Sequence, residues 1–519
     1  MMDTPSDYPL SLLLLLLSLP PLFAFFLLHR RRHSSSRRHP PGPPGWPIFG
    51  NLFQLGDMPH RTIANLSQTY GPVVRLQLGA INTVAILDAK TATDFFKSHD
   101  HNFADRTINQ TMRVHNYDKS SLALAPYGPH WRLMRRLLTV DMLVAKRIND
   151  TAPVRRKCVN DMVSWVAKEA GKVKAGEGVH VARFVFLMSF NLFGNLLLSR
   201  DMFDPESETG SELFEAMMGL MEWTGHPNVA DVFPWLGWVD PQGLQRRMKR
   251  DMGKAIEIAS RYVKERLEIQ HGDDGGFSRK KDFLDVLLDF QSGGTDDARN
   301  VSDKDLNVFI LEIFMAGSET TSSTIEWALT ELLCNRDCLT KVKSELNRVV
   351  GTTRDLEETD IENLPYLQAV VKETLRLHPP IPLLVPRRAI QDTHFMDYYI
   401  PKDTQIFVNV WAIGRDPHAW KDPLTFNPDR FISSGSESKL DYKGQHYEFI
   451  PFGAGRRMCA GVPLAHRVLN LVLGSLLHRF DWELDSRVTP STMDMRDKLG
   501  ITMRKLEPLL AVPKFVPPS

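Results

Sequence analysis

Cysteine is scarce in this chain of 519 residues, which contains only four. Cys334 and Cys338 are four positions apart, and no pair of cysteines has the CxxC spacing or another spacing typical of a zinc site or a disulfide framework. We interpret these two residues as small, partly buried apolar side chains of a helix, the usual fate of a free cysteine. Only Cys459 lies in an informative sequence context.

An excess of charge of one sign is also absent, because 63 Lys and Arg residues face 62 Asp and Glu residues. Residues 1–39 carry a local surplus of three positive charges, so the remaining chain is almost neutral. Such a body provides no basic surface for nucleic acid. No internal repeat and no flavin- or nicotinamide-binding fingerprint is found. The composition, 43% hydrophobic and 24% charged, is typical of a folded globular protein with a sizeable core.

The chain has one long uncharged hydrophobic run, from Leu10 to Leu28, which would span about 28 Å as a helix, close to the thickness of a bilayer core. Its flank is acidic before the run and basic after it, at residues 29–33, an order that argues against a cleaved signal peptide. We therefore predict a signal anchor at residues 1–29 with the body in the cytosol, the alternative being a peripheral apolar tail. We expect residues 30–50 to form a basic flank and a proline-rich, semi-rigid hinge, and residues 51–519 to form a single folded domain.

Hydrophobic periodicity predicts a mainly α fold with a smaller β part. Strands are expected at 73–78 and 83–87, which form a hairpin, and at 405–410. Loops are expected at 271–281 and 291–301, and a surface insertion at 433–444. Helices are expected at 90–98, 127–145, 158–170, 182–199, 211–222, 243–270, 282–290, 302–334, 336–350, 366–378 and 461–478.

The strongest motif surrounds Cys459. Residues 451–461 read PFGAGRRMCAG, which matches F-x-x-G-x-R-x-C-x-G at every fixed position and is followed by a helical pattern. A thiolate just ahead of a helix is favoured by free backbone amides and by the helix dipole. Gly455 permits a tight turn, and Phe452 can shield the sulfur from water. The alternative, a buried inert thiol, is disfavoured by the surrounding motif.

The predicted helix 302–334 carries the second motif, Ala316-Gly-Ser-Glu-Thr-Thr321. Ser302 is expected as its N-cap. The hydroxyl of Thr320 can donate to the carbonyl of Ala316, four residues earlier, and so open the helix locally. Gly317 costs about 1 kcal/mol in a helix interior, so we expect it to be required for space. One stripe of this helix should face the reacting centre: Ile310, Ile313, Gly317, Thr320 and Thr324.

Further pairs accompany these motifs. Glu373 and Arg376 lie at i,i+3 on one helix, which in isolation would indicate only a weak surface ion pair. Trp131 and Arg135 are one helical turn apart on another helix. Arg430 lies in FNPDRF at 426–431, and Arg387 follows Pro386.

Taken together and in this order, the motifs resemble cytochrome P450 over residues 40–519. The resemblance implies the P450 fold and a haem b whose iron is bound axially by Cys459, a ligand that favours O–O cleavage. Arg457, Trp131, Arg135 and Arg387 would contact the haem propionates. Glu373, Arg376 and Arg430 would form a buried structural network. Thr320 and Glu319 would help deliver protons during oxygen activation, with Gly317 leaving room for O2.

The anchor and hinge resemble those of microsomal members, and His378-Pro-Pro together with 412–417 resembles plant A-type members that oxidise monoterpenoids, including iridoids. This implies a single-pass protein of the endoplasmic reticulum membrane. NADPH-cytochrome P450 reductase would supply electrons, and O2 would supply one oxygen atom to a C–H bond of a small lipophilic substrate. The analogous substrate wall would comprise Leu122, Ile313, Ala316, Ile381, Leu384, Leu499 and Ile501, for each of which core packing is the alternative.

Two rival functions stay open on the sequence. A hydroperoxide-rearranging haem-thiolate enzyme would need neither reductase nor O2, and the intact pair Glu319 and Thr320 argues against it. A non-catalytic haem or ligand-binding protein would give a reduced carbon monoxide spectrum but would consume no NADPH with reductase.

Overall fold

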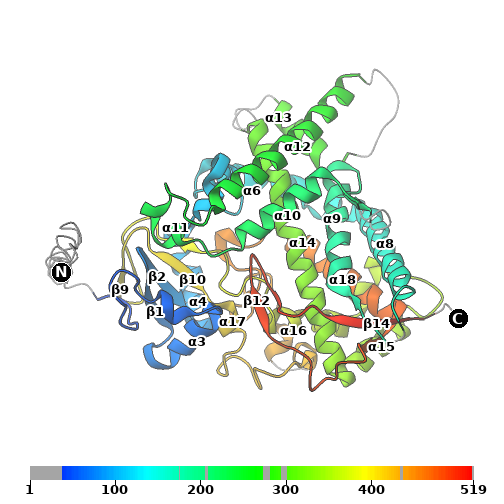
Figure 1. Cartoon of the computed structure of the whole chain (residues 1–519). Coiled ribbons are helices and arrows are strands. Elements are labelled where there is room, and N and C mark those ends of the chain that lie inside the picture. Colours follow the sequence, from blue (N-terminus) through cyan, green and yellow to red (C-terminus); the bar gives the residue numbers. More distant parts are fainter. Residues whose placement is uncertain are drawn as a thin grey trace, which may run out of the picture.

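The computed structural model describes residues 38–174, 176–204, 209–272, 281–293, 301–432 and 436–516 (Figure 1). The expected membrane span at 10–28 and most of the expected loops at 271–281 and 291–301 lie outside these residues. The described chain is mainly helical, with a smaller sheet region on one side. This agrees with the fold class that the periodicity predicts.

A bundle of long helices surrounds α14, Asp303–Cys334, which crosses the centre of the molecule (Figure 1). Most residues of α14 are buried, and the helix packs against α9, α12, α16 and α18. It begins where Ser302 and Asp305 form a capping box, as the N-cap prediction requires. The other long helices are α8 Ala152–Ala170, α9 Val181–Leu198, α10 Glu212–Thr224, α12 Leu244–Gly272, α13 Phe283–Ser292, α15 Arg336–Val349, α16 Pro365–Leu377 and α18 Val462–Arg479.

Three predicted helices differ from the observed ones, and α3, Pro59–Tyr70, was not predicted. The helix expected at 158–170 is α8, which already begins at Ala152. The helix expected at 127–145 is α6, Pro129–Arg136, continued by a π-helical turn at Leu137–Met142. The helix expected at 90–98 is likewise α4, Ala89–Asp94, continued by a π-helical turn at Phe95–His99. Both begin at a recognisable signal, Pro129 at the first turn of α6 and the Asp88 cap of α4. Apolar periodicity alone does not distinguish a wide turn from a regular one.

Within the described residues, α9 alone has the length and apolar composition to cross a membrane. However, 78% of it is buried inside the protein. It lies against α8 and α14 and forms part of the core.

The main sheet has the order β1-β2-β10-β7-β3. Strands β1, Val73–Leu78, and β2, Ile81–Ile86, form the predicted hairpin, and β10, Gln405–Val408, joins β2 in parallel. The two-residue strands β7, Arg387–Arg388, and β3, Asp105–Arg106, complete the sheet and were not predicted. Their pairing places Arg106 directly opposite Arg387.

Three strands form a second sheet, in which β14, Leu510–Phe515, lies between β11, Phe480–Leu484, and β4, Val179–His180. Strands β12, Asp497–Leu499, and β13, Met503–Lys505, form a separate hairpin. The Met503 amide donates to the Pro380 carbonyl, and the Ser323 hydroxyl of α14 donates to the Met503 carbonyl. The hairpin is therefore fixed against both α14 and the segment after α16.

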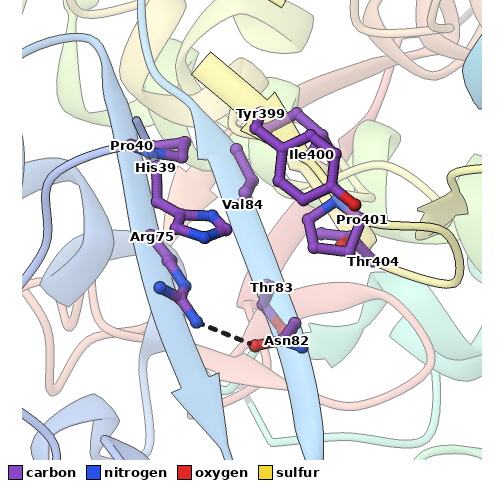
Figure 2. A pocket seen from close by; sticks show the side chains of 10 residues that line it. All are labelled: His39, Pro40, Arg75, Asn82, Thr83, Val84, Tyr399, Ile400, Pro401 and Thr404. Atoms are coloured by element: carbon purple, nitrogen blue, oxygen red, sulfur yellow. Dashed lines mark hydrogen bonds between the residues drawn. The ribbon is translucent and has the colours of Figure 1, made fainter. Parts of the chain in front are cut away.

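The proline-rich segment is extended, as predicted, but it is docked on the sheet. The amide of Arg75 in β1 donates to the carbonyl of Pro41 at 2.7 Å. A Cβ atom at Gly42 would lie 1.9 Å from the Arg75 carbonyl oxygen, so only glycine allows this approach. Figure 2 shows the neighbouring pocket, where His39 and Pro40 lie beside β1, β2 and the segment that follows β9, Tyr398–Ile400. Proline carbonyls can accept bonds from the sheet edge although the imino nitrogens donate none.

A surface insertion is expected at 433–444, and for its described residues, 436–444, this expectation is wrong. Tyr442 is only 4% exposed, and its ring contacts Phe449 and Phe452. Its hydroxyl is hydrogen bonded to the His466 ring at 2.5 Å. The segment is polar overall, but one aromatic side chain anchors it to the core.

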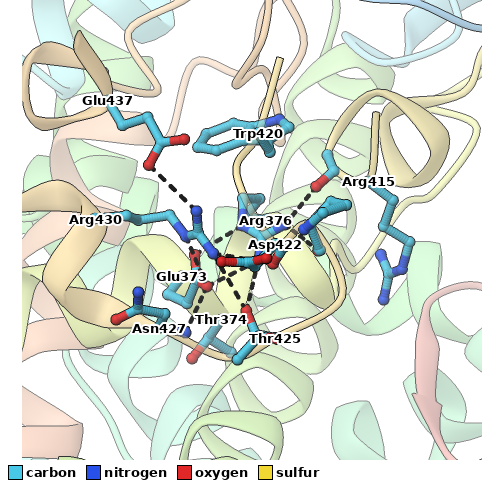
Figure 3. A network of polar contacts seen from close by, with 12 residues as sticks. Glu373, Thr374, Arg376, Arg415, Trp420, Asp422, Thr425, Asn427, Arg430 and Glu437 are labelled. Carbon is cyan, nitrogen blue, oxygen red and sulfur yellow. Dashed lines mark hydrogen bonds and ion pairs between the residues drawn. The ribbon is translucent and has the colours of Figure 1, made fainter. Parts of the chain in front are cut away.

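Glu373 and Arg376 of α16 form a buried network with Arg430 (Figure 3). The Glu373 carboxylate accepts from Arg376 Nε at 2.7 Å and from Arg430 Nε at 3.1 Å. It also accepts from the amide of Asn427 at 2.7 Å. The pair is therefore not the surface ion pair that its sequence spacing would suggest in isolation, because residues 414–430 fold over α16.

Candidate active site

Cys459 lies in a tight loop between the turn Gly455–Arg457 and α18. Its amide donates to the Phe452 carbonyl at 3.0 Å. Burial raises the pKa of the Cys459 thiol, whereas the amides of Gly461 and Val462 and the charge of Arg135 oppose that rise. The helix start thus directs two amides at the sulfur, as its position ahead of α18 predicts.

The turn at Gly455 requires glycine for two reasons. Its φ of +68° is a left-handed conformation that L side chains rarely adopt, and an added Cβ would lie 2.2 Å from Asp100 Oδ1. Asp100 accepts from the amide of Arg456 at 3.0 Å and from Arg387 Nη1 at 2.7 Å. This buried carboxylate therefore fixes the turn that precedes Cys459.

Three buried guanidinium groups, those of Arg106, Arg387 and Arg457, form a cluster next to this loop. Arg387 bonds Asp100 and the Ala454 carbonyl, and Arg457 donates to the carbonyls of Ala104 and Ala125. Burial lowers the pKa of Arg106, and the charges of Arg387 and Arg457 lower it further. Burial likewise lowers the pKa of Arg457 to about 10. Mutual repulsion of buried cations makes this cluster a favourable site for an anion.

Helix α6 places Trp131 and Arg135 on the same side of the site. The Trp131 indole donates to the Leu122 carbonyl at 2.8 Å, and the Arg457 guanidinium lies 4.3 Å from the centre of the Trp131 ring. Arg135 acts on Cys459 through its charge. One helical turn thus reaches both the cation cluster and the sulfur.

On α14 the Thr320 hydroxyl donates to the Ala316 carbonyl at 2.8 Å, as the spacing predicts. Ala316 has an exposed side chain although Phe314 and Ser318 next to it are buried. Burial raises the pKa of Glu319, whereas the Thr502 hydroxyl and the charge of Arg504 oppose that rise. Its Oε1 lies 3.8 Å from Arg504 Nη1, a guanidinium whose side chain is 53% exposed. Glu319 is therefore a half-buried acid beside one exposed cation.

Gly317 is required for a reason other than the one predicted. A Cβ atom there would lie 2.1 Å from the ring of Phe193 on α9. The expectation that Gly317 makes room for O2 is therefore replaced by helix packing, since the phenyl ring fills this space. Ile310 and Thr324 of the same expected stripe are also buried, so they too pack against protein side chains.

The seven residues of the expected substrate wall come from four elements. Ile313 and Ala316 lie on α14, and Leu122 lies in a loop that is bonded to α14. Ile381 and Leu384 follow α16, where Leu384 has a strained φ of +52° and lies beside Gly453. Leu499 and Ile501 lie on the β12–β13 hairpin, whose tip approaches Gly225 at the end of α10. No member of this set is fully buried.

The model of the cytochrome P450 family matches residues 40–512. The protein belongs to the cytochrome P450 family. Cytochrome P450 76A2 of Solanum melongena is 53% identical, with 92% of this chain and 93% of the relative covered. The iridoid oxidase of Catharanthus roseus is 51% identical over 92% of both chains, and the geraniol 8-hydroxylase of the same plant is 40% identical over 91% and 93%.

The fold agrees with this membership. A zebrafish cytochrome P450, in a structure with progesterone, superposes with a TM-score of 0.73 at 25% identity and covers 88% of this chain and 99% of its own. The protein is accordingly a monooxygenase and an oxidoreductase that uses haem b, O2 and NADPH-derived electrons. With these relatives it forms part of the plant A-type, monoterpenoid-oxidising group of cytochromes P450.

The residues of this P450 fit haem b. Cys459 offers one sulfur at a helix start, and a buried cation cluster lies beside it for carboxylates. Burial disfavours the charged thiolate, but a bound metal ion deprotonates a thiol and so favours that form. When haem b is bound, this sulfur would be the ligand for iron and this cluster would provide counter-charges for the propionates.

Three residues of this P450 site were missed in the sequence: Asp100, Arg106 and Glu312. Asp100 and Arg106 belong to no motif, and their positions result from pairing across a non-local sheet. Glu312 did leave a signal, because it interrupts the apolar run 309–315 in a helix predicted to be buried.

Proposed function

We propose that the protein inserts one oxygen atom from O2 into a C–H bond of a small lipophilic plant metabolite, a monoterpenoid or an iridoid. The observation that carries this proposal is that the apolar side chains of the expected wall, from four elements, are all incompletely buried and that Ala316 of α14 is exposed. Relatives named iridoid oxidase and geraniol 8-hydroxylase support the substrate class.

The decisive experiment expresses the full chain in microsomes with NADPH-cytochrome P450 reductase. Geraniol, an iridoid alcohol and unrelated aromatic substrates are supplied separately, and products are identified by mass spectrometry. We expect hydroxylated or further oxidised terpenoids that form only with NADPH and reductase. Product from a hydroperoxide without reductase would favour the rearranging enzyme instead, and a carbon monoxide spectrum without NADPH consumption would favour a non-catalytic haem protein.

Haem b would be held by Cys459 as the axial ligand, within the loop that Phe452 and Gly455 shape. When bound, this group supplies the iron at which O2 is activated. Arg457, Arg387, Trp131 and Arg135 would face the propionates, and the buried position of Arg106 adds a further cation. Cys459→Ser should abolish the thiolate-type spectrum of the ferrous carbonyl adduct; an unchanged spectrum would contradict the ligand assignment.

Thr320 and Glu319 would help to deliver protons during oxygen activation. The Thr320 hydroxyl gives its hydrogen to the Ala316 carbonyl and keeps its lone pairs free to accept from a neighbouring donor. Glu319, with its raised pKa, would hold a proton on the oxygen side, beside the Arg504 guanidinium at 3.8 Å. A Thr320→Ala enzyme that retained full coupling of NADPH oxidation to product would contradict this role.

The protein would be anchored in the endoplasmic reticulum membrane by residues 10–28, with the catalytic domain in the cytosol. Two groups of exposed apolar side chains support this placement. They lie next to each other, because the ring of Phe49 in the first group contacts the ring of Phe233, which lies within the segment of the second group. The two groups are Trp46, Ile48, Phe49 and Phe53, and Val229, Trp235, Trp238 and Val239. A continuous apolar patch of this kind suits the headgroup boundary of a bilayer.

The reductase would approach the cysteine side of the domain. Arg132 and Arg136 of α6 are exposed there, together with Arg456 of the cysteine loop. Positive residues at this position would steer an acidic partner to the side nearest the sulfur. Charge reversal at Arg132 should slow reduction without changing the haem spectrum.

A further inference from the structure

Glu312 lies on α14 one turn before Ala316 and two turns before Thr320, so the three side chains share one helical face. It is buried, and its carboxylate binds one loop only. Oε1 accepts from the Ser121 hydroxyl at 2.8 Å and from the Ala123 amide at 2.6 Å, and Oε2 accepts from the Leu122 amide at 2.6 Å. Three donors of consecutive residues are thus satisfied by one side chain.

The same loop, residues 121–125, presents its carbonyl groups to the cation side of the site. The Leu122 carbonyl accepts from the Trp131 indole, and the Ala123 carbonyl accepts from Arg106 Nε at 3.0 Å. Arg457 Nη2 donates to the Ala125 carbonyl at 2.6 Å. The loop therefore connects a carboxylate on the oxygen-side helix to the residues around the cysteine loop, and it carries Leu122 of the proposed substrate wall.

We propose that Glu312 is a positioning residue that fixes loop 121–125 against α14 and thereby sets the place of Leu122 in the substrate site. The proposal rests on the proposed function, because it assigns that loop to the substrate wall. Amides bound to an anion on one side and carbonyls bound to cations on the other leave the peptide planes little freedom to rotate. Loss of the carboxylate would leave buried amides without acceptors, and the loop would move to satisfy them.

A purely structural role is the alternative, and α14 itself provides the control. Glu326 is also a buried glutamate of α14, and it accepts from the Leu509 amide at 2.8 Å. It lies 14 residues further along, about 21 Å at the rise of an α-helix. It holds the C-terminal segment and contacts no residue of the proposed substrate wall.

The test compares Glu312→Gln, Ser121→Ala and Glu326→Gln in the full-length haem enzyme in reductase-containing microsomes. Glutamine keeps the volume but offers an amide nitrogen where an oxygen accepted, so at least one bond is lost. We expect normal haem content and a normal carbonyl spectrum in Glu312→Gln, because Cys459 is untouched. Hydrogen exchange of loop 121–125 should accelerate about tenfold, the spectral binding constant for geraniol should weaken by a similar factor, and the product ratio should change.

Ser121→Ala should show the same changes to a smaller degree, and Glu326→Gln should show none of them. The proposal is overturned if exchange and geraniol binding in both loop-side variants equal the wild type, or if Glu326→Gln reproduces their effects. Faster loop exchange with unaltered binding also overturns it. Failure of the proposed function is distinct, since wild-type microsomes would then yield no terpenoid product while 7-ethoxycoumarin or other probes could still report the loop effect.

Discussion

Replacing Glu373 with glutamine tests whether the buried network of Figure 3 holds the cysteine side of the domain together. Glu373 is 0% exposed and accepts two bonds from Arg376, one from Arg430 and one from the Asn427 amide. The variant removes the single charge that faces two buried guanidinium groups. Breaking a buried ion pair on one side costs about 3–5 kcal/mol, because the remaining charge is left uncompensated.

The expected value lies toward the lower end of that range. Arg376 also donates to the carbonyls of Gly414 and Pro423, so part of its hydrogen bonding survives. We therefore expect the free energy of unfolding to fall by about 3 kcal/mol. The assay is urea unfolding of the haem-loaded enzyme, followed by the loss of haem absorbance and by circular dichroism.

Glu437→Gln is the matched control, because Glu437 also pairs with Arg430 but its side chain is 20% exposed and its bond is longer, at 3.2 Å. That variant should lose less than about 1 kcal/mol. The reasoning is refuted if the two variants unfold at the same urea concentration, or if Glu373→Gln loses under about 1 kcal/mol. If Glu373→Gln yields no haem-loaded protein while Glu437→Gln does, the larger contribution of Glu373 to stability is confirmed, because only that variant fails to assemble.

Three further outcomes follow from particular contacts. Gly317→Ala should destabilise the protein by about 1–3 kcal/mol, because the new methyl group overlaps the Phe193 ring and this outweighs the gain in helix propensity. Adding Phe193→Leu should recover most of the stability, as measured by thermal unfolding. Coupling of NADPH oxidation to product should fall as the pH rises beyond the ordinary carboxyl range, because burial raises the pKa of Glu319 and deprotonation removes the donor. A Glu319→Gln enzyme should show a flat profile. The side chain of Trp238 is 88% exposed, so Trp238→Ser should weaken binding to lipid vesicles of the protein lacking residues 1–29, as measured by flotation. Unchanged flotation would contradict the membrane patch.

The sequence by itself determined the features that are encoded within a few turns of chain. Apolar periodicity located the long helices, Ser302 as N-cap marked the start of α14, and the i,i+4 spacing of Ala316 and Thr320 predicted their hydrogen bond. The cysteine motif could be read for the same reason, since its turn, its sulfur and the following helix are contiguous. Local geometry fixes such features, so sequence distance and spatial distance agree.

Only the tertiary structure decided what meets across long sequence separations. The pairing of β3 with β7 brings Arg106 opposite Arg387, and the approach of α9 to α14 gives Gly317 a packing role instead of a ligand role. Glu312 receives its meaning from a loop 190 residues earlier, which no periodicity reports. A buried charge depends on which partners the fold assembles around it, and that assembly is set by the packing of whole elements rather than by neighbouring residues.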